Sequence, residues 1–400
     1  CSPVHITYSQ IIRSDMMGTV FMLMTISAAL RIARDGRAAD YRWAALYLAL
    51  AVASKWPFLI AGLAVAGAAA ARIRDRDGEP MVELRRLGSF LMLAPVLLLA
   101  ISPYLLLAYK TVWHNLSGEA RTHHLGATGG GFFDNGWWYL SGPLSSAMGL
   151  VGLAMAFAGL WLMARNRKIG WVILPVLAAH ALIICLHGLR WERWVVPMLP
   201  LLSLSASLVA ADLFRKIANS GGMPWAKGLV ALSIVAVPLA LLPTAWLSAE
   251  ARDHDTRQAA TRWAVEHIPP GSTVMVEHFA FDLVREPWTV LFPMGDAGCV
   301  DAKAMLAGKI DYHKVETARG DRSNVDYGTV APARRNTCKA DYMILMEMKR
   351  YHDERAQFPA EDAAYRALLH TMEIKAVIAP EPGRSAGPHM VILAAPGGRN

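Results

Sequence analysis

Cysteine and charged residues are scarce in this chain. Four of its 400 residues are cysteine, which is too few for a scaffold held together by disulfides. Charged residues make up 18% of the chain, compared with about 25% in an ordinary soluble domain. Together with 54% hydrophobic residues, this composition excludes a disordered chain and a collagen-like fibre, and it does not suit a soluble cytosolic enzyme.

Two familiar sequence signals are also missing. No positively charged leader precedes an apolar core, so there is no recognisable signal peptide, and the chain opens with Cys-Ser-Pro rather than Met. We expect from this that an N-terminal part of the protein precedes residue 1. No glycine motif of the kind that cradles nucleotide phosphates occurs either, so no nucleotide cofactor is expected.

The basic excess belongs to the apolar part of the chain. Residues 1–248 hold 21 Lys and Arg against 11 Asp and Glu, whereas residues 249–400 hold 19 against 21. Basic residues between apolar segments are typical of membrane loops rather than of a nucleic-acid-binding surface. We therefore predict a transmembrane domain over 1–248, a soluble domain over 249–400, and no nucleic-acid partner.

Continuous apolar stretches in the first part predict a multi-pass α-helical membrane protein. Most of them approach the ~20 residues that a helix needs to cross a bilayer, although one is short. Continuous rather than alternating hydrophobicity excludes a β-barrel. The eight stretches are 16–33, 41–54, 56–72, 87–108, 146–164, 169–188, 194–212 and 228–248.

Lys and Arg residues predict the orientation of these spans. If the spans alternate, 15 cations lie in loops on one side and six on the other, and the richer side is cytoplasmic. This places the soluble domain outside the cytoplasm, and we expect a bacterial inner membrane. The six outer cations are Arg13, Lys55, Lys110, Arg121, Arg190 and Arg193.

Four of the outer cations fall at predicted helix ends, at the membrane boundary. These are Arg13, Lys55, Arg190 and Arg193, and such a cluster suits the phosphate of a lipid headgroup. Anchoring of the helices by snorkelling side chains is the alternative. Asp15 lies two residues after Arg13, just before an apolar span. A carboxylate at that depth is costly unless paired, so we expect a functional role, a helix N-cap, or both.

The longest outer loop, residues 109–145, holds further candidates. Adjacent His123 and His124 either supply a metal ligand or proton carrier or form an exposed pair. Three aromatic residues, 137–139, form an interfacial belt or, alternatively, a platform for sugar stacking. Asp134 is one of the few acidic residues on the outer side.

Four elements in order resemble those of the GT-C glycosyltransferases, which include protein O-mannosyltransferases and lipid A aminoarabinose transferases. Tyr8-Ser9-Gln10-Ile11-Ile12-Arg13-Ser14-Asp15 resembles their Tyr-Ser-Arg-x-x-x-x-Asp element, with Gln10 in place of Arg. Ala53-Ser54-Lys55-Trp56 is similar to their Ser/Thr-Lys-aromatic element. The loop that runs from His123 into Trp138-Tyr139-Leu140-Ser141-Gly142-Pro143-Leu144 is similar to their long outer loop. Arg190-Trp191-Glu192-Arg193-Trp194-Val195-Val196-Pro197-Met198-Leu199-Pro200 resembles their Arg-Tyr-x-x-Pro-x-x-Pro element.

The resemblance implies transfer of a sugar from a polyprenyl-phosphate-linked donor to a glycan, lipid or protein acceptor at the outer face. The family's principal catalytic acid follows its first transmembrane helix, and we expect that position to precede residue 1. A divalent metal is held near the outer loop in some relatives. The implied roles are donor-phosphate binding by Arg13, Lys55, Arg190 and Arg193, catalysis or acceptor orientation by Asp15, acceptor or loop contacts by Gln10, Asp134, Trp138 and Tyr139, and metal binding by His123 or His124.

Two other functions stay open at this point. A transporter or flippase for a lipid-linked or anionic solute would carry charges near the bilayer midplane and interrupted helices in matching positions. The charges of this chain gather at one face instead, and the sequence has no internal repeat. A membrane-anchored binding protein is the third possibility, but eight spans exceed what an anchor needs.

Residues 249–400 predict a small α/β domain. We expect an amphipathic helix over 253–268, a second helix near 360–372, and strands at 273–276, 341–346, 374–379 and 390–393. Cys299 and Cys338 both lie in this domain. Outside the cytoplasm they are expected to form a disulfide, unless they lie too far apart in the fold.

Overall fold

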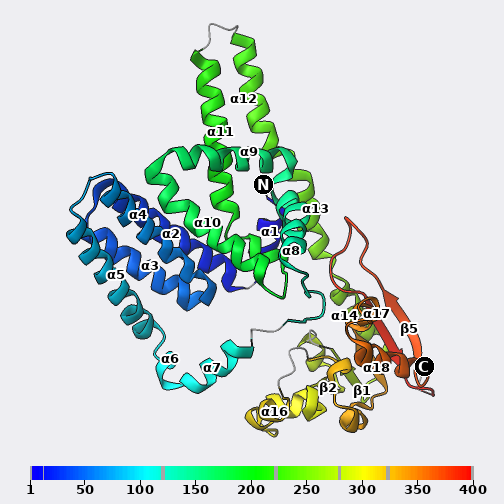
Figure 1. The fold of residues 1–400 in the computed structure, drawn as a ribbon. Coiled ribbons are helices and arrows are strands. Elements are labelled where there is room, and N and C mark those ends of the chain that lie inside the picture. The colour runs from blue at the N-terminus through cyan, green and yellow to red at the C-terminus, as the bar shows by residue number, and fades with distance from the viewer. Residues whose placement is uncertain are drawn as a thin grey trace. The chain divides into compact units, whose positions relative to one another are not determined.

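The computed structural model describes residues 2–11, 13–118, 122–219, 224–277, 281–320 and 325–397. The chain forms two compact units (Figure 1). The first comprises Cys1–His123 and Ala127–Trp246, and the second comprises His124–Gly126 and Leu247–Asn400. Three residues of the long loop therefore belong to the second unit.

The first unit is a helical bundle with one continuous apolar core. Its elements are α1 (Pro3–Ser9), α2 (Ser14–Asp35), α3 (Ala38–Ser54), η1 (Trp56–Ala61), α4 (Gly62–Arg74), α5 (Pro80–Ile101), α6 (Tyr104–Leu107), α7 (Tyr109–Gly118), α8 (Phe132–Tyr139), the π-helical turn η2 (Leu140–Leu144), α9 (Ser145–Arg165), α10 (Arg167–Leu186), η3 (Glu192–Val195), α11 (Leu199–Asn219) and α12 (Pro224–Leu239). Helix α13 (Leu242–Asp253) crosses the boundary between the units.

Within the described residues, six helical segments are long and apolar enough to cross a membrane. All eight apolar stretches of the sequence are largely helical, but two lie outside this set of six. Helix α3 has only 17 residues, and α11 carries Asp212, Arg215 and Lys216 toward its end. The six segments are Ser14–Asp35, Trp56–Arg74, Pro80–Ile101, Phe132–Arg165, Arg167–Leu186 and Lys227–His267.

The bounds predicted for the fourth span, 87–108, are wrong. Helix α5 begins at Pro80 and ends at Ile101, and a separate short helix, α6, follows. Pro103 explains the end, because proline has no N–H to continue the hydrogen-bond ladder of a helix. Pro80 explains the start, because proline is favoured in the first turn.

Two glycines allow helices of the first unit to pack closely. A Cβ atom at Gly67 of α4 would overlap the carbonyl oxygen of Trp171 in α10. A Cβ atom at Gly159 of α9 would overlap the carbonyl oxygen of Ser205 in α11. Such contacts bring helix backbones together, and close packing of this kind drives the association of helices in membranes.

A buried carboxylate joins four helices at one end of the bundle. Glu83 of α5 is 0% exposed. Its Oε1 accepts hydrogen bonds of 3.0 Å from Arg72 of α4 and of 3.0 Å from Arg86, and its Oε2 accepts one of 2.7 Å from the Tyr41 hydroxyl of α3. Arg86 also donates to the carbonyl of Gly36, the C-cap of α2, at 2.6 Å.

The second unit is a mixed sheet of six strands in the order β3-β2-β1-β4-β6-β5. The strands are β1 (Thr273–Val276), β2 (Thr289–Pro293), β3 (Cys299–Asp301), β4 (Tyr342–Leu345), β5 (Glu373–Ile378) and β6 (Met390–Ala394). Neighbours β2, β1 and β4 are parallel, and the other pairs are antiparallel. All four predicted strands form, whereas β2 and β3 were not predicted.

Helices and short helical turns complete the second unit. Apolar side chains form a core on each face of the sheet, so the central strands are buried on both sides. The predicted helices are present as α14 (Thr256–His267) and α18 (Pro359–Leu369). The others are η4 (Phe281–Arg285), η5 (Gly295–Ala297), α15 (Ala302–Leu306), α16 (Tyr312–Ala318), η6 (Tyr327–Thr329), η7 (Pro332–Cys338) and α17 (Met348–Asp353).

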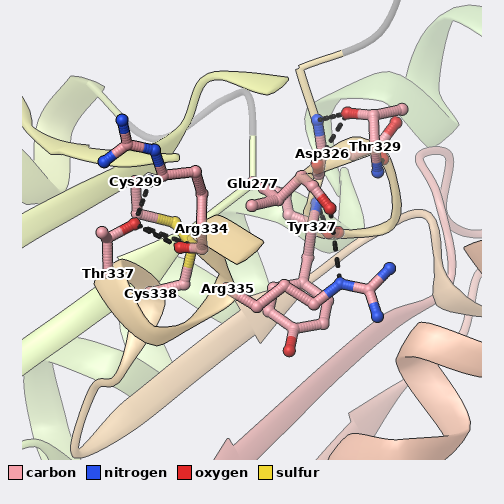
Figure 2. The surroundings of a disulfide bond; sticks show 10 residues. Glu277, Cys299, Asp326, Tyr327, Thr329, Arg334, Arg335, Thr337 and Cys338 are labelled. Atoms are coloured by element: carbon pink, nitrogen blue, oxygen red, sulfur yellow. Dashed lines mark hydrogen bonds between the residues drawn. A yellow bond between two sulfur atoms is a disulfide. The ribbon is translucent and has the colours of Figure 1, made fainter. Parts of the chain in front are cut away.

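The predicted disulfide between Cys299 and Cys338 is present (Figure 2). It joins the edge strand β3 to the end of η7, with 4.9 Å between the two Cα atoms. The Thr337 hydroxyl accepts a hydrogen bond of 2.7 Å from the Cys299 N–H beside it. The bridge therefore closes a loop of 39 residues that contains most of the irregular part of the unit.

Reduction of this disulfide is expected to destabilise the second unit by about 2–4 kcal/mol, because an open loop of this length has more conformational entropy when unfolded. Thermal unfolding of the whole protein with and without a reductant measures the change. A Cys185→Ala variant, which lacks the one free thiol of the described residues, is expected to respond to the reductant as the wild type does. An unchanged unfolding temperature, with both thiols shown to be free, would contradict the prediction.

Candidate functional site

A buried ion pair lies where α2 begins and α3 ends. The Lys55 ammonium is 2.5 Å from Oδ1 of Asp15. Asp15 is in the first turn of α2 and is 4% exposed, whereas 27% of the Lys55 side chain is exposed. Helices α2 and α3 are antiparallel neighbours, which brings these residues together across 40 positions of sequence. Asp15 and Lys55, both assigned to the outer side from the sequence, are thus in direct contact.

A second polar contact joins α1 to η3. The Tyr8 hydroxyl donates a hydrogen bond of 3.1 Å to Oε2 of Glu192. Burial raises the pKa of Tyr8, and the negative charge of Glu192 raises it further. The charges of Arg193 and Arg13 oppose this rise in the pKa, so both guanidinium groups act on the same hydroxyl. The structure thus brings Arg13 and Arg193 into one electrostatic neighbourhood.

His180 contacts the segment that carries Arg193. This residue is 8% exposed in α10, and its Nε2 is 2.8 Å from the carbonyl oxygen of Trp194. Trp194 directly follows Arg193, so this contact ties η3 to α10. His180 is therefore a hydrogen-bonded residue of the bundle core.

Aromatic rings hold the two arginines of the Arg190–Pro200 segment. The Arg190 guanidinium lies 5.2 Å from the ring centre of Trp138, and that of Arg193 lies 4.1 Å from the ring centre of Trp191. Such cation–π contacts contribute about 0.5–1 kcal/mol each at exposed sites and more when desolvated. These contacts fix the direction of both side chains.

The backbone of this segment is fixed by the long loop. The N–H of Arg190 donates to the carbonyl of Ala127 at 2.8 Å, and the N–H of Trp191 donates to the Tyr139 hydroxyl at 3.1 Å. The Asn135 side chain donates to the carbonyls of Cys185 and His187 at 3.1 and 2.9 Å. Helix α8 therefore positions the residues between α10 and η3.

The remaining predicted loop residues have mainly local contacts. Tyr139 is 2% exposed, so it is not part of an exposed aromatic belt; that interpretation fits only Trp137, which is 68% exposed. Asp134 accepts a hydrogen bond of 3.2 Å from the N–H of Gly131 at the start of α8. Gln10 is exposed at the C-cap of α1.

His123 and His124 are adjacent in sequence but belong to different units. Nδ1 of His123 is 2.8 Å from the Thr122 hydroxyl, and Nδ1 of His124 is 2.9 Å from the carbonyl oxygen of Leu125. Within the described part of the chain, no three His, Cys, Asp or Glu side chains gather as a metal site would require. The predicted role of the two histidines in metal binding stays a prediction, and two of the outer residues, Glu119 and Arg121, lie outside the described residues.

An apolar cavity of about 480 Å³ lies among α1, α9, α11 and α12 of the first unit. Ser2, His5 and Ile6 of the N-terminal segment line it, together with Met148 and Pro238. The cavity does not include Asp15, Lys55 or Arg193. Helix α1 nevertheless joins the two features, because it lines the cavity and also carries Tyr8 in contact with Glu192.

The sequence did not assign roles to Tyr8, Glu192 or Asn135. A signal for the first two was present, since both lie inside the elements that carry the family resemblance. Their contact spans 184 residues, which no local pattern predicts. Comparison with known proteins adds no further assignment: no family model, curated protein or solved structure matches this chain.

Proposed function

We propose that this protein is a membrane glycosyltransferase that uses a polyprenyl-phosphate-linked sugar. The observations that carry the proposal are two polar contacts of the first unit: Lys55 pairs with Asp15, and Tyr8 bonds to Glu192 within the electrostatic reach of Arg13 and Arg193. With Arg190, this region holds four cations and two carboxylates. Such an excess of positive charge suits a phosphate group.

The proposed topology places this region at the extracytoplasmic face of a bacterial inner membrane, with the second unit on the same side. Apolar helices long enough to cross the membrane support membrane association. The distribution of Lys and Arg supports the sidedness. The donor and acceptor would then meet where a lipid headgroup lies.

Each group has a role in the proposed reaction. The sugar–phosphate bond breaks as the phosphate takes up negative charge, and fixed cations stabilise charge that develops in the transition state. Lys55, Arg13 and Arg193 would bind that phosphate, while Asp15 fixes the ammonium of Lys55 and orients the acceptor.

The apolar cavity beside α1 supports a lipid-linked donor. It would accommodate part of an apolar chain while α1 and η3 hold the polar groups that contact the headgroup. A soluble nucleotide sugar has no such chain, and the sequence has no motif for one.

Transfer of labelled sugar from a synthetic polyprenyl-phosphate donor to endogenous acceptors, by the full-length protein in vesicles, tests the proposal. Arg193→Ala is expected to lower the transfer rate by about 10-fold or more, because it removes one charge-assisted contact to the phosphate, worth about 1.5–3 kcal/mol. Arg34→Ala is the matched control, since Arg34 pairs with Asp35 at the opposite end of α2 and is exposed.

Three outcomes decide the test. Transfer by the wild type and the control but not by Arg193→Ala supports the proposal. Equal transfer by all three variants contradicts the role of the cations. Movement of the intact lipid-linked sugar across the membrane without transfer would favour a flippase instead.

A further inference from the structure

Two carboxyl groups are buried in the second unit, away from the site described above. Glu277 directly follows β1 and is 0% exposed. Asp326 precedes η6 and is 1% exposed. Figure 2 shows both in the same region as the disulfide. Carboxyl groups are almost never fully buried unless a partner compensates the charge, so this pair requires an explanation.

Glu277 is bound by four hydrogen-bond donors. Its Oε1 accepts from the N–H of Tyr327 at 2.9 Å and from the Tyr365 hydroxyl at 2.5 Å. Its Oε2 accepts from the N–H groups of Met346 and Glu347 at 2.7 and 3.1 Å, at the end of the parallel neighbour β4. Burial raises the pKa of Glu277, and the four donors oppose this rise because they stabilise the ionised form. Of the two acids, Glu277 is therefore the one whose negative charge is better stabilised by hydrogen bonds.

Asp326 has fewer donors and lies next to that charge. Its Oδ1 accepts from the N–H of Thr329 at 3.0 Å, and its Oδ2 is 3.0 Å from the Tyr351 hydroxyl. The following residue, Tyr327, donates its N–H to Glu277, so one backbone turn joins the two acids. Burial and the charge of Glu277 raise the pKa of Asp326 to about 8.

Cations do not compensate the pair. Among the described residues, neither Glu277 nor Asp326 forms an ion pair with Lys or Arg. The charged and titratable groups around the pair are Tyr365 of α18, Tyr351 of α17, Tyr327 of η6, Glu347 after β4 with its partner Arg350, Arg335 of η7, and Glu354. Arg350 is bound to Glu347 at 3.0 Å, and Arg335 acts on the Tyr327 hydroxyl rather than on the acids.

We propose that Glu277 and Asp326 hold one proton between them and act as a pH-sensitive lock on the turn formed by residues 326–329. With the proton bound, one charge is buried and four donors stabilise it, so the turn is fixed to the ends of β1 and β4. Without the proton, two negative charges are buried close together without a cation. Separation of the turn from the strands then exposes Asp326 to water and relieves the cost of burying both charges.

The disulfide confines this release. Cys338 is bonded to Cys299 of β3 and follows the turn by nine residues, so the downstream end of the segment stays anchored. The lock concerns the second unit alone and does not depend on the proposed transferase function. A domain on the outer side of a cell membrane experiences the pH of the surroundings, which gives such a lock a signal to respond to.

The direction of the pH effect follows from proton binding. An unfolded Asp titrates near pH 4, whereas Asp326 in the folded protein titrates near pH 8. Between these values the folded form keeps a proton that the open form has released, so the lock weakens as the pH rises. It is complete below about pH 4 and lost above about pH 8.

Amide hydrogen exchange of the full protein tests the proposal at the N–H groups of Tyr327 and Thr329, after correction for the intrinsic exchange rate. From pH 5 to pH 8.5, their protection factors are expected to fall by a factor on the order of 500–1,000, as linkage predicts for one proton. Asp326→Asn removes the titrating group and is expected to abolish this fall.

Glu347→Gln is the matched control, because that carboxyl pairs with Arg350 and is not bonded to the turn; the fall is expected to persist. The proposal is overturned if the wild type shows no fall, if Asp326→Asn shows the same fall, or if Glu347→Gln abolishes it. Should Asp326→Asn fail to fold, infrared spectroscopy of the wild type decides. A protonated carboxylic acid must persist at pH 7 and disappear on titration near pH 8.

Discussion

Replacing Glu83 with alanine is expected to destabilise the first unit by about 3–5 kcal/mol, the usual cost of removing one partner from a buried ion pair. The carboxylate is fully buried and accepts hydrogen bonds from Tyr41, Arg72 and Arg86. Without it, the guanidinium of Arg72, whose side chain is only 9% exposed, is left in an apolar environment without its countercharge. The junction of α2, α3, α4 and α5 loses its common partner.

Glu83→Gln separates the loss of charge from the loss of hydrogen bonds. The amide keeps one acceptor oxygen but cannot accept at both positions, so we expect a smaller loss of about 1.5–3 kcal/mol. Unfolding of the detergent-solubilised protein by a denaturing detergent measures both values. Arg34→Ala, which breaks an exposed pair with Asp35, is expected to change the stability by less than about 1 kcal/mol.

If the hydrogen-bond network at Glu83 has a purely structural role, its loss changes the stability of the protein and no other property. A Glu83→Ala protein within about 1 kcal/mol of the wild type would mean that water reaches the Arg72 side chain, and it would contradict the burial argument.

The helices could be predicted from the sequence because each apolar run carries its own signal. A continuous run of about 20 apolar residues has no stable alternative to a helix in a bilayer. Ends were less predictable: the fourth span ends at Ile101 because Ser102 and Pro103 follow, although the apolar run continues to 108. At this position the missing N–H of proline, and not the end of the apolar run, sets the end of the helix.

Strands β2 and β3 could not be predicted with the same ease. Strand β3 has three residues, too few to show an alternation, and β2 has five and ends at Pro293. Such strands depend on pairing with a neighbour, and β3 pairs only with β2. Their signal is therefore tertiary rather than local.

The candidate site was predicted in part. Alternation of spans places Asp15 and Lys55 at the same face, and the structure pairs them. The alternation says nothing of which side chains meet within that face, so the contact of Tyr8 with Glu192 was not foreseen. Neighbouring positions in the sequence do not have to share a site either: His123 and His124 follow one another in the chain but belong to separate units.

Lys55→Met is expected to destabilise the first unit by about 3–5 kcal/mol and to lower sugar transfer by a factor on the order of 100–1,000. The two effects have different causes. Stability falls because Asp15, 4% exposed, keeps a buried charge without its partner. On the proposed function, transfer falls because the donor phosphate loses a fixed positive charge where negative charge develops.

A double-mutant cycle separates the two causes. Asp15→Asn alone is expected to cost less, about 1–3 kcal/mol, because the Lys55 side chain is 27% exposed and its ammonium can reach water. The double variant, Asp15→Asn with Lys55→Met, leaves no unpaired charge. It is expected to regain most of the stability that Lys55→Met loses, because replacing both members of a buried ion pair is often neutral or stabilising. Transfer should not recover, because the cation is still missing.

The pattern of recovery decides what the pair does. If the double variant regains both stability and transfer, Lys55 acts only as the partner of Asp15, and the phosphate is bound elsewhere. If it regains stability while transfer stays at the level of Lys55→Met, the ammonium itself acts on the donor. If Lys55→Met leaves both quantities unchanged, neither residue belongs to the site, and the proposed function loses the contact on which it rests.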